Sequence, residues 1–229
     1  MTGNVVENNL LRLKQEIAPY IPKIIAVTKY YDISAILDAF NAGLRDFGES
    51  RAIDAIKKIE QLPESIRRES QFHFIGHLQT NKVRQIVGKV DLIQSVDSVK
   101  LAKEISKQSV KNNVHTDVLV EVNIGMEESK SGVLPENLHE LLDEIKDFDN
   151  ISVKGLMTIP PICDSKQKIS KYFDKMNNIF IDISSKNIDN ISMDILSMGM
   201  SADYYEAILS GANMVRIGSS LFGARNYNK

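Results

Sequence analysis

The sequence predicts an α/β protein that folds as one TIM-type (β/α)8 barrel over residues 1–229, with an extra helix before the first strand. Short apolar runs rich in β-branched residues alternate with segments of helical apolar spacing, and they group into eight β/α units. No Pro-, Gly- or Ser-rich linker divides the chain, and 229 residues lie within the usual range for one barrel domain. The same alternation would also permit an open, doubly wound parallel sheet, which is the alternative architecture.

The predicted elements follow one another in a regular order. Apolar residues at helical spacing predict a first helix over 3–17, which ends before Pro19. Apolar and β-branched runs predict strands at 24–28, 45–48, 72–75, 91–94, 117–123, 152–158, 193–197 and 213–217. Helices are predicted after the strands at 33–42, 50–60, 80–87, 98–112, 135–146, 166–184 and 202–210, with a short helical turn after the last strand.

The composition narrows the class of protein. The 28 basic and 30 acidic side chains give a net charge of -2, and no block of like charges offers a surface for nucleic acid or an anionic membrane. No apolar segment approaches the ~20 residues of a membrane span, and the first residues do not resemble a secretory signal. Cys163 is the single cysteine, so no intrachain disulfide can form. We therefore expect a cytoplasmic protein that binds neither nucleic acid nor membrane.

Lys29 is a lone cation at the end of the apolar run 24–28. Burying an ammonium group costs free energy unless its pKa falls or it finds a partner. Such a lysine is therefore either half of a structural ion pair or an amine nucleophile suited to Schiff-base chemistry. Buried amine nucleophiles are rare, so the run by itself favours the ion pair.

Two loops suggest a phosphate site. The segments 199–201 and 218–220 each follow a predicted strand and open a helical segment, and Ser201 is a good helix cap. Helix N-termini suit a dianion, and in (β/α)8 proteins phosphate commonly lies between the loops after strands seven and eight. The alternative is that Ser201 only caps a helix and Gly218 only ends a strand.

Arg216 lies within the last predicted strand, between two apolar residues. It could form an ion pair inside the barrel, with Glu121 or Glu49, or donate to a ligand's ring nitrogen or carboxylate. His77 could be a general base or contact a ligand. Because no second histidine or carboxylate stands at ligand spacing from His77, we expect no metal site.

Seven segments resemble one known family, in the same order along almost the whole chain. They are IIAVTK (24–29), DFGES (46–50), FHFIGHLQTNK (72–82), VEVNIGMEESKSG (120–132), KGLMTIP (154–160), LSMGMSADYYEAI (196–208) and MVRIGSSLFGAR (214–225). The chain resembles the pyridoxal 5'-phosphate homeostasis proteins, the single-domain relatives of the alanine racemase barrel. Thr28 and Ser50 depart from that family's usual serine and asparagine, and the shorter Ser50 leaves any contact of that asparagine in question.

The resemblance implies roles for particular residues. Lys29 would form the internal aldimine with pyridoxal 5'-phosphate, and Arg216 would face the pyridine nitrogen. Ser201 and the backbone of Gly218 and Ser219 would hold the phosphate. The residues that would lie near the cofactor are His77, Asn81 and Met157.

The resemblance also bears on activity. It implies a protein of vitamin B6 homeostasis that holds and releases the cofactor without substantial catalysis, because racemisation needs two acid/base groups and only Lys29 is evident. We expect no second, β-rich domain, a monomer, and pyridoxal phosphate-dependent apo-enzymes as candidate recipients. The alternatives are a pyridoxal phosphate-dependent amino-acid racemase and a sugar-phosphate enzyme that uses Lys29.

Overall fold

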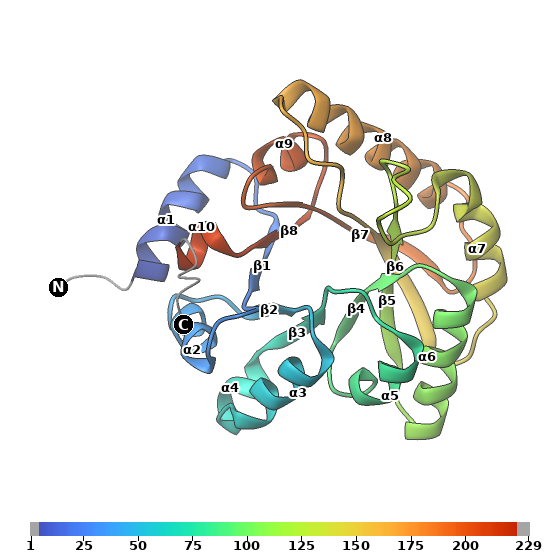
Figure 1. The fold of residues 1–229 in the computed structure, drawn as a ribbon, viewed down its shortest axis with the longest axis horizontal. Coiled ribbons are helices and arrows are strands. Elements are labelled where there is room, and N and C mark those ends of the chain that lie inside the picture. Colours follow the sequence, from blue (N-terminus) through green and yellow to red (C-terminus); the bar gives the residue numbers. More distant parts are fainter. Residues whose placement is uncertain (1–4, 224–229) are drawn as a thin grey trace.

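A computed structural model describes residues 5–223, in which eight parallel strands close into a barrel in the order β1 to β8 (Figure 1). The strands are β1 Lys23–Val27, β2 Asp46–Glu49, β3 Gln71–Phe74, β4 Leu92–Val96, β5 Thr116–Val122, β6 Ile151–Thr158, β7 Ile191–Met200 and β8 Met214–Ile217. β8 pairs in parallel with β1, which closes the sheet. The predicted (β/α)8 barrel is thereby confirmed, and the open sheet is wrong.

Helices surround the barrel, as Figure 1 shows. They are α1 Val5–Ile17, α2 Ile33–Asn41, α3 Ala52–Gln61, α4 Glu64–Glu69, α5 Val83–Ile86, α6 Val99–Asn112, α7 Leu138–Ile145, α8 Lys166–Ser184, α9 Tyr204–Leu209 and α10 Ser219–Phe222. Two short 3-10 helices, Thr80–Lys82 and Pro135–Asn137, precede α5 and α7. Within the described residues, no helix is long and apolar enough to cross a membrane.

The extra helix before the first strand is also confirmed. α1 buries the apolar stripe that runs from Val6 to Ile17, and it packs beside α10, which follows the last strand (Figure 1). The Asn9 side-chain amide donates to the Leu221 carbonyl at 2.9 Å. The two ends of the described chain are therefore joined on one side of the barrel.

Two elements differ from the sequence-based expectation. α4 was not predicted as a helix of its own, although Pro63 precedes it, Glu64 lies in its first turn, and Arg67 and Arg68 lie in its last. β7 is longer than the predicted 193–197, because it pairs with β6 from Ile191 onwards and with β8 as far as Met200, across a register shift.

The barrel interior is packed with side chains. Ile25, Leu92, Leu119, Met157 and Met214 form an apolar cluster inside the barrel, separate from the large core between strands and helices. A packed interior leaves the ends of the barrel as the places where a ligand can bind.

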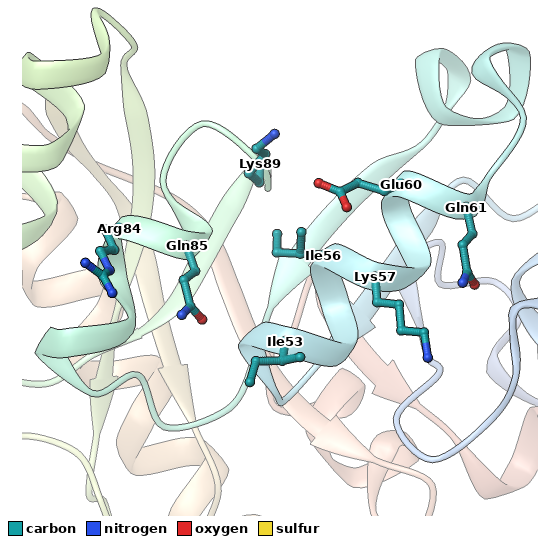
Figure 2. A pocket seen from close by; sticks show the side chains of 8 residues that line it. All are labelled: Ile53, Ile56, Lys57, Glu60, Gln61, Arg84, Gln85 and Lys89. Atoms are coloured by element: carbon teal, nitrogen blue, oxygen red, sulfur yellow. The ribbon is translucent and has the colours of Figure 1, made fainter.

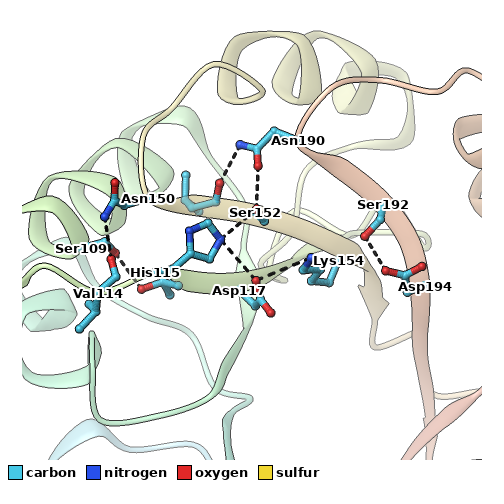
Figure 3. Close-up of polar contacts among 12 residues, drawn as sticks. Ser109, Val114, His115, Asp117, Asn150, Ser152, Lys154, Asn190, Ser192 and Asp194 are labelled. Carbon is cyan, nitrogen blue, oxygen red and sulfur yellow. Dashed lines mark hydrogen bonds and ion pairs between the residues drawn. The ribbon is translucent and has the colours of Figure 1, made fainter.

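One end of the barrel is fastened by polar contacts between the starts of β5, β6 and β7 (Figure 3). The Ser152 hydroxyl donates to Asn190 Oδ1 at 2.6 Å, and Asn190 Nδ2 donates to the Ile151 carbonyl at 2.7 Å. His115 Nε2 lies 2.9 Å from the Ser152 hydroxyl. These contacts lie at the N-terminal ends of the strands, opposite the loops that carry the predicted site.

Candidate functional site

Lys29 lies two residues beyond the end of β1 and is half-buried. The residue before it is held from both sides: the Thr28 hydroxyl donates to Glu49 Oε1 at 2.6 Å, and Lys58 Nζ donates to the Thr28 carbonyl at 2.7 Å. Lys58 Nζ also bonds Glu49 Oε1 at 2.6 Å, and both side chains are largely buried. The buried ion pair next to this strand end is therefore Lys58–Glu49, whose two members are not distinguished in the sequence from the neighbouring charged residues.

Arg216 points into the barrel and is 3% exposed. Its Nη1 donates to the Ser197 hydroxyl and its Nη2 to the Thr158 carbonyl, both at 2.8 Å. Burial lowers the pKa of Arg216 to about 10, against the opposing charges of Glu121 and Asp203, so it stays a cation at neutral pH. Two of its five N–H donors are used in these bonds, which fix the plane of the guanidinium group.

The suggested partners of Arg216 have different roles. Glu49 pairs with Lys58, so the Arg216–Glu49 pair is wrong. Glu121 is 7% exposed, and it interacts with Arg216 as a charge without a hydrogen-bonded ion pair between them. Burial, and then the neighbouring charge of Asp97, raise the pKa of Glu121 to about 7, while Arg216 opposes the rise.

A chain of polar contacts continues from Arg216 through the barrel interior. The Ser197 hydroxyl donates to Gln94 Oε1 at 2.7 Å, and Gln94 Nε2 lies 3.2 Å from His73 Nδ1. His73 Nε2 lies 3.0 Å from Asp46 Oδ1. Because an amide nitrogen can only donate, His73 accepts at Nδ1 and carries its proton at Nε2, towards Asp46. His73 thus lies in β3, as expected, with both ring nitrogens engaged.

The loops after β7 and β8 are bonded directly to each other. The Ser201 hydroxyl accepts the backbone N–H of Gly218 at 3.1 Å and that of Ser220 at 3.2 Å. α9 begins only at Tyr204, with Asp203 at the cap position, so the expectation that Ser201 caps this helix is wrong. Ser201 instead orients the turn that leads into α10.

Gly199 allows the loop after β7 to pass close to α9. Its φ is +90°, and a Cβ at this position would lie 2.6 Å from the Ala207 Cβ. Glycine at this position therefore allows the loop that carries Ser201 to keep its path beside α9.

The remaining predicted residues, His77, Asn81 and Met157, form no hydrogen bond with Arg216 or Ser201 in the described part of the chain. His77 is exposed at the rim, with Nδ1 3.2 Å from the Ser131 hydroxyl and 3.7 Å from Asp97 Oδ2. Asn81 lies exposed on the 3-10 helix after β3 and, within residues 5–223, forms no hydrogen bond to the other predicted residues. Met157 is buried in the apolar cluster inside the barrel.

No metal centre is evident in the described part of the chain, where no three His, Cys, Asp or Glu side chains could hold an ion together. The end of the barrel nonetheless presents an amine, a fixed guanidinium cation and a backbone turn with N–H donors. Such groups suit an anionic ligand that carries an electrophilic carbon.

Comparison with known proteins shows the broad class of protein to which the chain belongs. Residues 4–226 match the family described as the alanine racemase N-terminal domain. An alanine racemase of Clostridium difficile has the same fold, with a TM-score of 0.78 at 18% identity, over 97% of this chain and 57% of that one.

Closer relatives define the family within that class. The chain is 43% identical to the pyridoxal phosphate homeostasis protein of Aquifex aeolicus, over 90% of this chain and 88% of the relative, and 39% identical to that of Haemophilus influenzae, over 90% and 86%. The structure of PipY from Synechococcus elongatus with PLP bound has a TM-score of 0.83 at 28% identity, and the match covers 95% of this chain and all of that one. The chain belongs to the pyridoxal phosphate homeostasis protein family.

Proposed function

We propose that this protein binds pyridoxal 5'-phosphate at the C-terminal end of the barrel and acts in vitamin B6 homeostasis, by holding the cofactor and releasing it without substantial catalysis. Membership of the family and the PLP-bound PipY structure support cofactor binding. The observation that supports the assignment to these residues is their position on neighbouring strands: Lys29 follows β1, while Arg216 lies in β8 and the turn 218–220 follows it. Ser201 follows β7, the other neighbour of β8.

The residues present fit this cofactor. Its aldehyde would react with an amine, and when bound it supplies an electron-withdrawing ring. Lys29 is the amine at this end of the barrel, and its backbone is positioned through Thr28 by the buried Lys58–Glu49 pair. The Ser201 hydroxyl accepts the N–H groups of Gly218 and Ser220, so it would donate its own proton to the phosphate, beside the Ser219 N–H. His77, Asn81 and Met157 stay predictions as further neighbours of the cofactor.

Arg216 would face the ring nitrogen as a hydrogen-bond donor. Ser197 and Thr158 fix its guanidinium group, and its pKa of about 10 keeps it charged. A cation at that nitrogen opposes its protonation, so the ring withdraws electrons less strongly than it would beside a carboxylate. This arrangement supports retention of the cofactor over amino-acid chemistry.

One observation favours a second candidate, a pyridoxal phosphate-dependent amino-acid racemase. Racemisation needs an acid/base group besides Lys29, and Glu121 is a buried carboxyl group whose pKa is raised to about 7. Turnover that depends on Glu121 would therefore support the racemase.

Two measurements test the proposal. The purified protein should be yellow, and borohydride should fix the cofactor to a peptide that contains Lys29; Lys29→Ala should lose both, and an adduct at another lysine would refute the assignment. The loaded protein should then be incubated with L- and D-amino acids. Turnover in the usual enzyme range of ~1–10³ per second would refute the non-catalytic role.

Release needs a recipient. We infer that a monomer of this chain delivers the cofactor to pyridoxal phosphate-dependent apo-enzymes. Transfer from loaded protein to an apo-enzyme faster than through free cofactor would support delivery, and equal rates would refute it.

A further inference from the structure

A groove lies between α3 and α5, on the outer helices of the barrel and outside the proposed cofactor site (Figure 2). Its volume is about 570 Å³. Its lining residues are Ile53, Ile56, Lys57, Glu60, Gln61, Arg84, Gln85 and Lys89.

The floor of the groove is apolar. Ile53 is 64% exposed, although its neighbours Ala52 and Ala55 on α3 are buried. Ile56 stands one turn further along α3 and is partly buried against the main core. A partner that covers this aliphatic surface would gain a favourable binding free energy of about 25 cal/mol for each Å² of apolar surface removed from water.

The rim of the groove is basic. Lys57, Arg84 and Lys89 contribute three cations against the single carboxylate of Glu60, while the whole chain carries a net charge of -2. Within residues 5–223 none of these three cations forms an ion pair, unlike the neighbouring Lys58, which is paired with Glu49. The rim therefore offers unneutralised positive charge around an apolar floor.

One polar atom in the groove lacks a partner. Gln85 Oε1 is buried and receives no hydrogen bond from the described residues. Buried acceptors are normally satisfied, and the Gln85 side chain as a whole is only partly buried. A rotation of this side chain towards an occupant that brings a donor would satisfy the oxygen.

We propose that the groove docks an acidic, amphipathic helix of a partner protein. Aliphatic side chains of that helix would cover Ile53 and Ile56, its carboxylates would face the cations of the rim, and a side-chain amide or hydroxyl would donate to Gln85. The charge complementarity selects this occupant over a neutral apolar one, and the isoleucine floor selects it over a phosphate backbone.

A designed peptide probes the surface directly. The probe is a helical peptide of about 18 residues, with leucines on one face and glutamates on the other. A matched peptide replaces every glutamate by lysine, and another keeps the acidic composition in scrambled order. Binding is measured by fluorescence anisotropy at low and high salt.

The acidic peptide should bind saturably, and the lysine and scrambled peptides should not. The triple variant K57E/R84E/K89E should weaken acidic-peptide binding about tenfold or more at low salt and should gain binding of the lysine peptide. Ile53→Ser should weaken acidic-peptide binding about fivefold. These side chains are exposed, so the variants should fold, and circular dichroism checks this.

Matched controls lie on other helices. Ile181→Ser removes an isoleucine that is 56% exposed on α8, and K103E/K107E/K111E reverses three exposed lysines on α6. Neither should change binding by more than about twofold. No saturable binding, or equal loss in the controls, would overturn the proposal. A dimer in sedimentation that Ile53→Ser dissociates would overturn it in favour of a second copy of this chain.

Discussion

Lys58→Met tests whether the buried Lys58–Glu49 pair holds the segment that carries Lys29. The variant keeps most of the apolar side-chain stem but removes the Nζ that bonds both Glu49 Oε1 and the Thr28 carbonyl. The Glu49 carboxylate then stays buried, with the Thr28 hydroxyl as its remaining hydrogen-bond donor. The segment that leads to Lys29 therefore loses the bond from Lys58 but keeps the backbone bonds of Thr28 to Gly48 and Tyr31.

The expected cost follows from the burial of the pair, whose side chains are 13% and 7% exposed. Removing one partner of a buried ion pair destabilises a protein by about 3–5 kcal/mol, because the other charge is left uncompensated. The double variant Glu49→Leu/Lys58→Met removes both charges and fills the space with apolar groups. We expect it to lie within about 2 kcal/mol of the wild type.

Urea unfolding measures the free energies, and borohydride fixation measures how much cofactor Lys29 retains. Lys57→Met is the matched control, since Lys57 is the exposed neighbour on the same helix, and it should change stability by less than about 0.5 kcal/mol. A loss below about 1 kcal/mol in Lys58→Met, or a double variant as unstable as the sum of the single variants, would refute the reasoning.

Three further predictions concern the phosphate turn, the buried carboxyl group and the far end of the barrel. Ser201→Ala should weaken retention of pyridoxal 5'-phosphate by about 1.5–3 kcal/mol, because it removes the hydroxyl that would donate to the charged phosphate, while the backbone N–H groups of the 218–220 turn remain; equal affinity of the wild type for unphosphorylated pyridoxal would contradict a phosphate site. Because the pKa of Glu121 is raised from 4.5 to about 7, its contribution to stability is complete below pH 4.5 and is lost as the pH rises through 7, by about 3 kcal/mol. Glu121→Gln should flatten that part of the stability–pH curve in urea titrations, and an unchanged curve would rule out this carboxyl group as its source. Asn190→Ala should cost about 1–2 kcal/mol of stability, since it removes the bonds to Ser152 and Ile151, and should leave cofactor affinity unchanged; a parallel loss of affinity would show that the two ends of the barrel are coupled.

The order of strands and helices could be predicted from the sequence because most strands contain a short apolar run and most helices have an apolar stripe. Lys29, Arg216 and the turn 218–220 could also be placed at one end, since the ends of parallel strands meet there. α4 was missed because its six residues bury none of their side chains, so it has no apolar period to detect.

The pairings within the site could not be predicted, because they depend on three-dimensional register. Lys58 is one of two adjacent lysines on the amphipathic helix α3, and the apolar pattern of the sequence does not show which of them is buried. The raised pKa of Glu121 likewise depends on burial and on Asp97, which lies on another strand's end. The role of Ser201 depends on where α9 begins, and residue propensity alone favours the cap that the structure does not form.

Gln94 fixes the direction of the hydrogen bonds that run through the barrel interior from Arg216 to Asp46. Gln94 satisfies Ser197 with its oxygen and His73 with its nitrogen, so flipping its amide would set donor against donor on one side. The orientation of the Ser197 hydroxyl, which accepts from Arg216, is therefore set by Gln94 on β4, three strands away around the barrel. In every bond of the series the donor lies on the Arg216 side and the acceptor on the Asp46 side. The hydrogen bonds across the barrel interior therefore all have the same direction.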